Sequence, residues 1–95
     1  MTDKTEVVIY TTCHVLEEKK NKMFFYHYWS FKKTPKQIEE VKKIWFACDK
    51  KILGYFECVK SINSQTDIEW SPGSWTPLDE PMDVKPFRGF RYKWW

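Results

Sequence analysis

Long apolar runs are missing from this sequence of 95 residues. No stretch approaches the ~18 consecutive apolar residues that a membrane-spanning helix needs. The first eight residues, MTDKTEVV, carry charges where a signal peptide would have an apolar segment. We therefore expect a cytoplasmic protein that makes no use of a membrane.

Cysteine and histidine are also scarce, and their spacing excludes the usual metal motifs. The three cysteines, Cys13, Cys48 and Cys58, form no CxxC pair, and the sequence has only two histidines. Because structural metal sites need clustered thiolate and imidazole ligands, we expect no metal and no cofactor. An odd number of cysteines in or beside apolar runs is typical of reduced core residues in a cytoplasmic protein.

Aromatic residues, in contrast, are abundant: they make up 19% of the chain, with 6 Trp, 7 Phe and 5 Tyr. Each buried ring removes roughly 150 to 250 Å² from water, so a few rings can replace many aliphatic side chains in a small core. The length favours one domain that spans residues 1–95.

The clearest structural pattern is the stretch KIWFACDKKILGYFECVK, residues 43–60. Two apolar, aromatic and β-branched runs flank the polar residues 49–51, which predicts a β-hairpin with a short turn. Both faces of the hairpin are apolar, so both need cover. Gly54, in the middle of the second strand, predicts a bend in the sheet more readily than the close approach of a ligand.

Other strands are predicted from composition. Four segments have the β-branched and aromatic character of strands, namely 6–15, 23–31, 67–70 and 87–95. The first two flank a charged turn and would pair as an antiparallel hairpin. The proline-rich residues 71–86 predict an ordered irregular loop.

One short helix is predicted to begin at Thr34. The Thr34 side chain could accept a hydrogen bond from the backbone N–H of Gln37, and Pro35 would occupy the first helical position. Ile38 and Val41 would share its apolar face over two or three turns. The sequence therefore predicts an α+β fold: a small mixed, strongly curved β-sheet or pseudo-barrel of five to six strands with one short helix.

The order of these segments resembles the small PUA-like domains, in particular the ASCH and EVE branches. The hairpin IWFACDKKILGYFECV carries the strongest likeness, and residues 28–32 (YWSFK) and 87–90 (FRGF) are similar to an entry strand and a closing strand in relatives. The GxKxxExR signature of ASCH domains is absent. The resemblance implies a pseudo-barrel with a cleft beside the short helix and a tendency to bind RNA or a modified nucleobase.

The favoured function is a binding module for RNA, DNA or a modified base rather than an enzyme. Such a module needs rings for stacking, a polar group for the base edge and cations for phosphate. The net charge of +3 does not indicate this by itself, but residues 85–95 contain four basic residues and no acid. The candidate ligand-binding residues are Trp29, Ser30, Lys32, Lys36, Trp70, Arg88 and Arg91, although rings of this kind more often belong to the core.

Two alternatives remain open. An ASCH-type hydrolase acting on a nucleoside would need an activated acid or lysine, for which Lys32 with Thr34, or Glu57, are candidates. A protein-interaction role is suggested by Trp94 and Trp95, because two adjacent indoles would either fold back over the sheet or form a homodimer interface.

Overall fold

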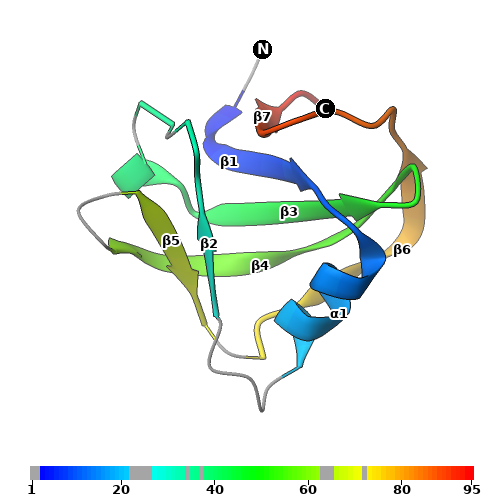
Figure 1. Ribbon diagram of the computed structural model, residues 1–95, viewed down its shortest axis with the longest axis horizontal. Helices are drawn as coiled ribbons and strands as arrows, with labels where there is room; N and C mark the ends of the chain where they lie inside the picture. Colours follow the sequence, from blue (N-terminus) through cyan, green and yellow to red (C-terminus); the bar gives the residue numbers. More distant parts are fainter. Residues whose placement is uncertain (1–2, 22–26, 34, 37, 63–65, 72) are drawn as a thin grey trace.

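The computed structural model describes residues 3–21, 27–33, 35–36, 38–62, 66–71 and 73–95. In this described part of the chain, seven strands form one curled sheet, accompanied by an α-helix and one turn of 3-10 helix (Figure 1). The predicted α+β fold with a small, strongly curved sheet and a short helix is confirmed, although the sheet of the described residues has seven strands rather than the five or six expected. The elements are β1 (Asp3–Tyr10), α1 (Cys13–Lys20), β2 (Tyr28–Ser30), η1 (Ile38–Glu40), β3 (Lys43–Cys48), β4 (Lys51–Ile62), β5 (Asp67–Trp70), β6 (Thr76–Asp83) and β7 (Phe90–Lys93).

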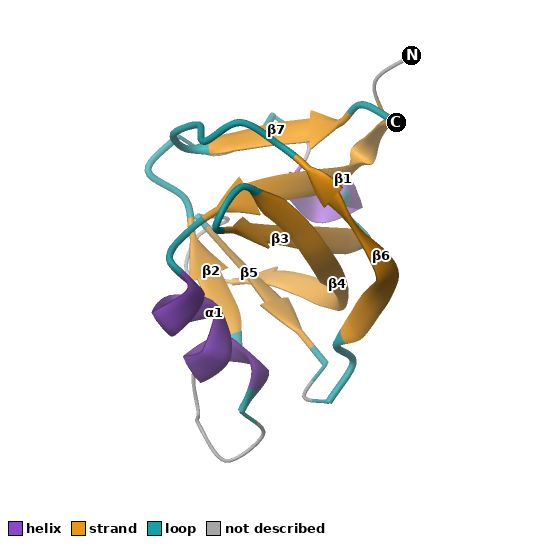
Figure 2. Ribbon diagram, turned by 90° about the vertical axis from the view of Figure 1, so that its right-hand side faces the viewer, coloured by secondary structure: helices purple, strands orange, loops and turns teal. Residues whose placement is uncertain are grey.

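The sheet has the strand order β2-β5-β4-β3-β1-β7, and β6 pairs separately with β4. β1 runs parallel to β3 and antiparallel to β7, so the sheet is mixed. The 12-residue strand β4 pairs with β3 and β6 over its first part and with β5 over its last part. Because one strand serves two groups of neighbours, the sheet bends around β4 (Figure 2).

The predicted hairpin is confirmed as β3 and β4. Asp49 and Lys50 form its turn with φ angles of 51° and 61°, and Cys48 pairs with Lys51. Two consecutive positive φ angles are the mark of a type I′ turn, whose twist matches that of the flanking strands. The hydroxyl oxygen of Tyr10 accepts a 2.7 Å hydrogen bond from the Lys50 backbone N–H and so ties this turn to β1.

Both faces of the central strands are buried, as their apolar character predicts. Val7, Val8 and Ile9 of β1 are each 0% exposed. Alternation along the strands divides the core in two. The larger cluster includes Val7, Ile9, Ile44, Phe46, Phe56 and Trp70, whereas Val8, Trp45, Ala47 and Ile52 form the smaller one on the other face.

The prediction of a strand through residue 15 followed by a charged turn was wrong. β1 ends at Tyr10, and α1 starts after Thr12, whose Oγ1 accepts a 3.2 Å hydrogen bond from the Val15 backbone N–H. Threonine at this position is a favoured helix cap. α1 then buries Leu16 in the larger cluster, so tertiary packing overrides the local β-branched composition.

Two neighbouring predictions also needed correction. The expected hairpin between the first two strands does not form, because β2 pairs with β5 and β1 pairs with β3 and β7. The helix expected from Thr34 is present only as the three-residue η1, and β3 begins soon after it. Thr34 and Gln37, on which that helix start was based, lie outside the described residues.

The proline-rich segment contains a strand that its composition argued against. β6 pairs with β4 on one side and includes Pro77 and Pro81, which an edge strand tolerates because a ladder hydrogen bond is not needed at every residue. β6 also explains Gly54. A Cβ there would lie 2.9 Å from Pro77 Cα and closer still to the Thr76 carbonyl oxygen. The close approach comes from the protein's own backbone, and the β-bulges beside Gly54 supply the expected irregularity.

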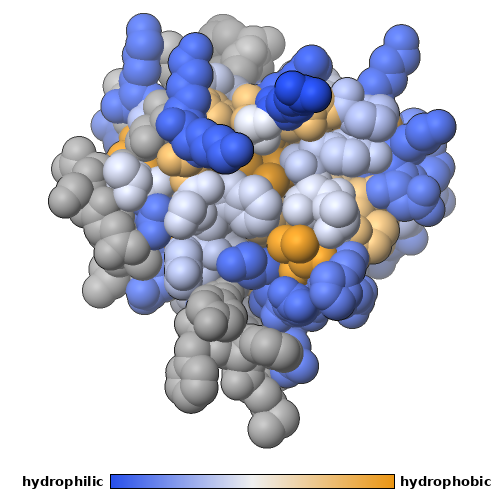
Figure 3. Space-filling model, viewed as in Figure 1, coloured by the Kyte–Doolittle hydropathy of each residue, from blue (hydrophilic) through white to orange (hydrophobic). Residues whose placement is uncertain are grey.

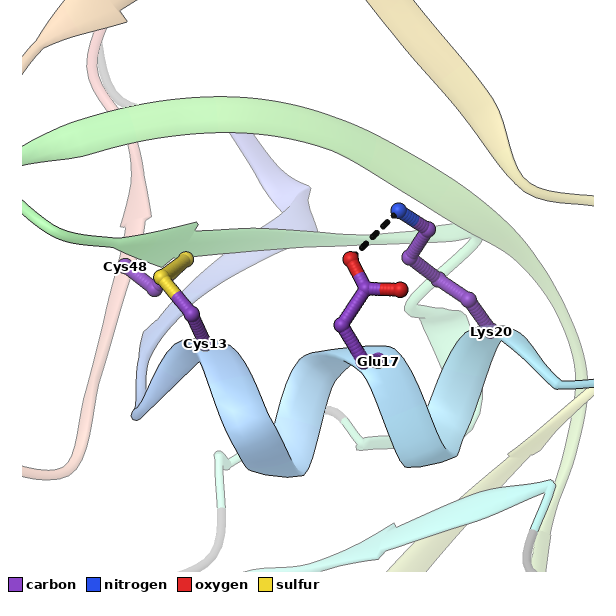
Figure 4. A network of polar contacts seen from close by, with 4 residues as sticks. All are labelled: Cys13, Glu17, Lys20 and Cys48. Carbon is purple, nitrogen blue, oxygen red and sulfur yellow. Dashed lines mark hydrogen bonds and ion pairs between the residues drawn. A yellow bond between two sulfur atoms is a disulfide. The ribbon is translucent and has the colours of Figure 1, made fainter.

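The expectation of three reduced cysteines was wrong. Cys13, at the start of α1, and Cys48, at the end of β3, form a disulfide with a Cα–Cα distance of 5.2 Å (Figure 4). Figure 4 also shows the 3.0 Å ion pair between Glu17 and Lys20 further along the same helix. The cysteines therefore do not support a cytoplasmic location, since disulfides are rare there.

Candidate functional site

A cleft of about 640 Å³ lies where three distant segments meet. The end of β1 supplies Tyr10, β2 and the residues after it supply 29–33, and the approach to β7 supplies 87–90. Its volume falls within the ~300 to 1,000 Å³ usual for small-ligand sites. The lining residues are Tyr10, Trp29, Ser30, Phe31, Lys32, Lys33, Phe87, Arg88, Gly89 and Phe90.

The aromatic rings of the cleft are fixed by contacts with one another and with the core. Phe31 meets Phe90 edge-on at 5.6 Å, and Tyr10 meets Phe87 at 5.7 Å. Trp29 packs against the buried Phe46 at 5.4 Å. Edge-to-face pairs of this kind are favourable beyond the area that they bury. Apart from the buried Phe31, these cleft rings are half-exposed, so they are both held in place and open to a ligand.

Charge in the cleft is of one sign. Lys32, Lys33 and Arg88 line it and are exposed, and none of the described lining residues is acidic. Gly89 has a φ of 73°, a left-handed conformation that glycine adopts without strain and that turns the chain beside Arg88. On the face seen in Figure 3, strongly hydrophilic side chains surround a middle of intermediate hydropathy that is broken by hydrophobic patches. The cleft can therefore offer stacking surfaces beside cations.

The structure brings together four of the seven residues predicted to bind a ligand: Trp29, Ser30, Lys32 and Arg88. Trp70 is 0% exposed and stacks on Phe56 at 4.5 Å in the core, away from the cleft. Lys36 is exposed but does not line the cleft. Arg91 lies on β7 with its guanidinium carbon 4.9 Å from the centre of the Phe87 ring, beside the cleft.

Lys33 adjoins the predicted Lys32, whereas the other cleft residues were missed by sequence reasoning, namely Tyr10, Phe31, Phe87, Gly89 and Phe90. Phe31 follows the predicted Ser30 and Phe87 precedes the predicted Arg88. The prediction therefore identified these two segments of the cleft, although it did not name the phenylalanines. Tyr10 had no such signal, because it reaches the cleft only through the pairing of β1 with β7. The cleft lies between the segment after β2 and the approach to β7, whereas the resemblance placed it beside the short helix.

Behind Trp29, a half-buried lysine links the site to α1. Lys19 Nζ donates a 2.8 Å hydrogen bond to the Tyr28 carbonyl oxygen and lies 5.9 Å from the centre of the Trp29 ring. Burial lowers the pKa of Lys19, while the charges of Glu18 and Asp67 act to raise it.

Cys58, the free cysteine, is also part-buried, and burial raises the pKa of its thiol to about 12. Such a thiol stays protonated and is a poor nucleophile.

Of the residues named for hydrolysis, Lys32 is the one that lines the cleft among those that the structure describes. Glu57 is exposed on β4 and does not line it, and Thr34 lies outside the described residues. Within the described ranges, no group of three or more His, Cys, Asp or Glu side chains is arranged to hold a metal ion. The same part of the chain has no helix with the length and apolar character needed to cross a membrane.

Trp94 and Trp95 fold back over the sheet, as one of the two expectations for them required. Trp95 meets the buried Trp45 at 5.0 Å and Trp94 at 5.1 Å, in both cases edge-on. The two indoles nevertheless remain 44% and 42% exposed.

Comparison of the chain with protein-family models, with curated proteins and with solved structures found no match.

Proposed function

We propose that the cleft binds a base of single-stranded RNA or DNA, or a modified nucleobase. The observation that carries this proposal is the combination of half-exposed rings with Lys32, Lys33 and Arg88 in one cleft whose described lining is free of acids. A base stacked on an aromatic side chain gains roughly 1 to 3 kcal/mol. The resemblance of the hairpin to PUA-like domains points in the same direction.

Each part of a nucleotide has a matching group in the cleft. Trp29 offers an indole that packs edge-on against Phe46, so that stacking on it needs little reordering. Ser30, exposed at the end of β2, can both donate to and accept from a base edge. Arg88 presents a planar set of donors suited to phosphate, and the two lysines add positive charge.

The test is a titration of the full chain at low salt with oligouridylate, oligothymidylate, structured RNA and a panel of modified nucleosides. Backbone amide and Trp29 indole signals in NMR spectra should shift in the segments 29–33 and 87–90. If no ligand in this set changes the spectra, the proposal fails.

Variants separate the cleft from general surface charge. We expect Lys32→Ala and Arg88→Ala each to weaken binding and to reduce the salt dependence by about one phosphate contact. Lys36→Ala is the matched control, because Lys36 is an exposed lysine of the same region that does not line the cleft. Equal losses for Lys32→Ala and Lys36→Ala would show that binding, if present, does not use the cleft.

A further inference from the structure

A chain of aromatic contacts leads out of the cleft. Phe87 lines the cleft, and its ring also lies 6.5 Å from that of Trp94. Trp94 contacts Trp95, and Trp95 rests on Trp45, a member of the smaller core cluster. We call Phe87, Trp94 and Trp95 the aromatic strip. It is continuous with the cleft, because Phe87 belongs to both.

The two tryptophans of the strip are ordered and still accessible. Trp94 and Trp95 are the most exposed large apolar side chains among the described residues, at 44% and 42%. Each is nonetheless held edge-on by a neighbouring ring, Trp94 by Phe87 and Trp95 by Trp45. A ring that is already fixed loses little conformational entropy when a ligand stacks on it.

Cations accompany the strip along its length. The Arg91 guanidinium lies over the Phe87 ring, and Lys93 Nζ lies 5.4 Å from the centre of the Trp95 ring and 5.5 Å from that of Trp45. Lys93 also contacts Glu6 at 3.8 Å, which offsets part of its charge. Residues 85–95, which supply the strip, carry four basic residues and no acid. This charge favours a polyanion over an apolar partner.

From this continuity and charge, we infer that the aromatic strip is a second stacking surface for single-stranded nucleic acid. A strand that places one base in the cleft would stack following bases on Trp94 and Trp95, with Arg91 and Lys93 near its phosphates. The inference rests on the proposed function of the cleft and extends it: the preferred ligand is an oligonucleotide rather than a single nucleoside.

The experiment compares ligands of increasing length. Oligouridylates and oligothymidylates of one to about nine nucleotides are titrated into the full chain and into the double variant Trp94→Leu/Trp95→Leu. Leucine keeps an apolar side chain over Trp45 but removes the flat ring. We expect affinity of the unaltered chain to rise with length. The variant should bind mononucleotides unchanged but lose roughly 5- to 150-fold for each base that no longer stacks on the longer ligands.

Two controls keep the result unambiguous. Trp94→Phe/Trp95→Phe retains aromatic rings and should restore most of the affinity for long strands. If the two tryptophans have a purely structural role, the circular dichroism spectra of both double variants should differ from that of the unaltered chain. Equal affinity of the unaltered chain and the leucine variant for every length would overturn the inference while leaving the cleft proposal intact. Absence of binding at every length would overturn both.

The same samples test a different occupant. If size-exclusion mass shows a dimer for the unaltered chain and a monomer for the leucine variant, and nucleic acid does not dissociate that dimer, the strip is a homodimer interface. That outcome overturns the inference.

Discussion

The amino group of Lys19 on α1 donates a 2.8 Å hydrogen bond to the carbonyl oxygen of Tyr28, the first residue of β2. Its nitrogen also lies 5.0 Å from the centre of the Tyr28 ring and 5.9 Å from those of Trp29 and Trp70. One cation thus connects the helix to the strand that carries Trp29 into the cleft. β2 is only three residues long and pairs with β5 alone, so this connection adds a second element to those that fix it.

Replacing Lys19 by methionine should loosen β2. The substitution keeps the apolar stem but removes a charge-assisted hydrogen bond and the cation over the rings, and relief of the desolvation of the amine offsets part of this loss. We expect the free energy of unfolding to fall by about 1 to 2 kcal/mol and the Trp29 indole signal to shift. Urea denaturation and NMR spectra measure the two effects. Lys36→Met is the control, and an equal effect of both substitutions would contradict the assigned role of Lys19.

Reduction of the disulfide between Cys13 and Cys48 should destabilise the fold. The bridge spans a sequence separation of 35 residues, for which the loop-entropy relation gives about 3 to 4 kcal/mol. Denaturation with and without a phosphine reductant should show a lower midpoint on reduction. The same comparison in Cys13→Ala/Cys48→Ala should show no effect of the reductant. In the variant Cys58→Ala the reductant should still lower the midpoint. If it does not, the pairing of Cys13 with Cys48 is contradicted.

Gly54→Ala should detach β6 from β4. The new methyl group would collide with backbone atoms of Thr76 and Pro77, which cannot move aside as a side chain could. We expect a loss of about 3 kcal/mol in the free energy of unfolding, as for severe overpacking. Gly89→Ala is a useful comparison, because a Cβ there meets no atom within 4 Å and the strain comes only from its φ of 73°. That variant should lose about 1 to 2 kcal/mol, and a larger loss for Gly89→Ala than for Gly54→Ala would refute this explanation.

The Cys58 thiol should be inert in the folded protein near neutral pH. Burial raises its pKa from 9.0 to about 12, so the folded state keeps its proton where the unfolded chain begins to lose one. This difference in pKa between the two states makes the free energy of unfolding depend on pH. Its contribution to stability is fully present below pH 9.0 and is lost as the pH rises through about 12. Reaction with a disulfide reagent at pH 8 should be slow for the native protein and fast in urea. Rapid labelling of the native protein would show that Cys58 is accessible.

Local patterns in the sequence were sufficient for the hairpin, for β5 and for most of β1, because alternation of side chains across a strand leaves a direct trace. They were insufficient for α1 and β6. The helix follows a β-branched run and depends on the burial of Leu16, and the strand tolerates Pro77 and Pro81 only because it lies at an edge. Both elements are set by contacts with residues distant in sequence.

The cleft was predictable only in part, for a similar reason. Trp29, Ser30, Lys32 and Arg88 were named from residue chemistry together with the resemblance of their segments to PUA-like domains. Trp70 was named on the same grounds, yet the stacking of Trp70 on Phe56 fills the core. The residue type alone does not distinguish an indole that binds a ligand from one that packs in the core. The disulfide was missed because an odd number of cysteines gave no reason to expect a pair. β1 lies parallel to β3, and this alignment brings Cys48 at the end of β3 next to Cys13 at the start of α1.

The position of β1 between β3 and β7 has a consequence for how the chain acquires its structure. Val7 pairs with Ile44 on one side and with Tyr92 on the other, so neither partner exists when a ribosome has made only the first strand. The hairpin of β3 and β4 is local and can form alone in microseconds. β1 must then wait with its apolar side chains in water until residues 43–47 have emerged, and its second edge is covered only after residues 90–93 follow. During synthesis the first strand therefore leaves apolar side chains and two unpaired edges in water for longer than the hairpin does, which favours aggregation.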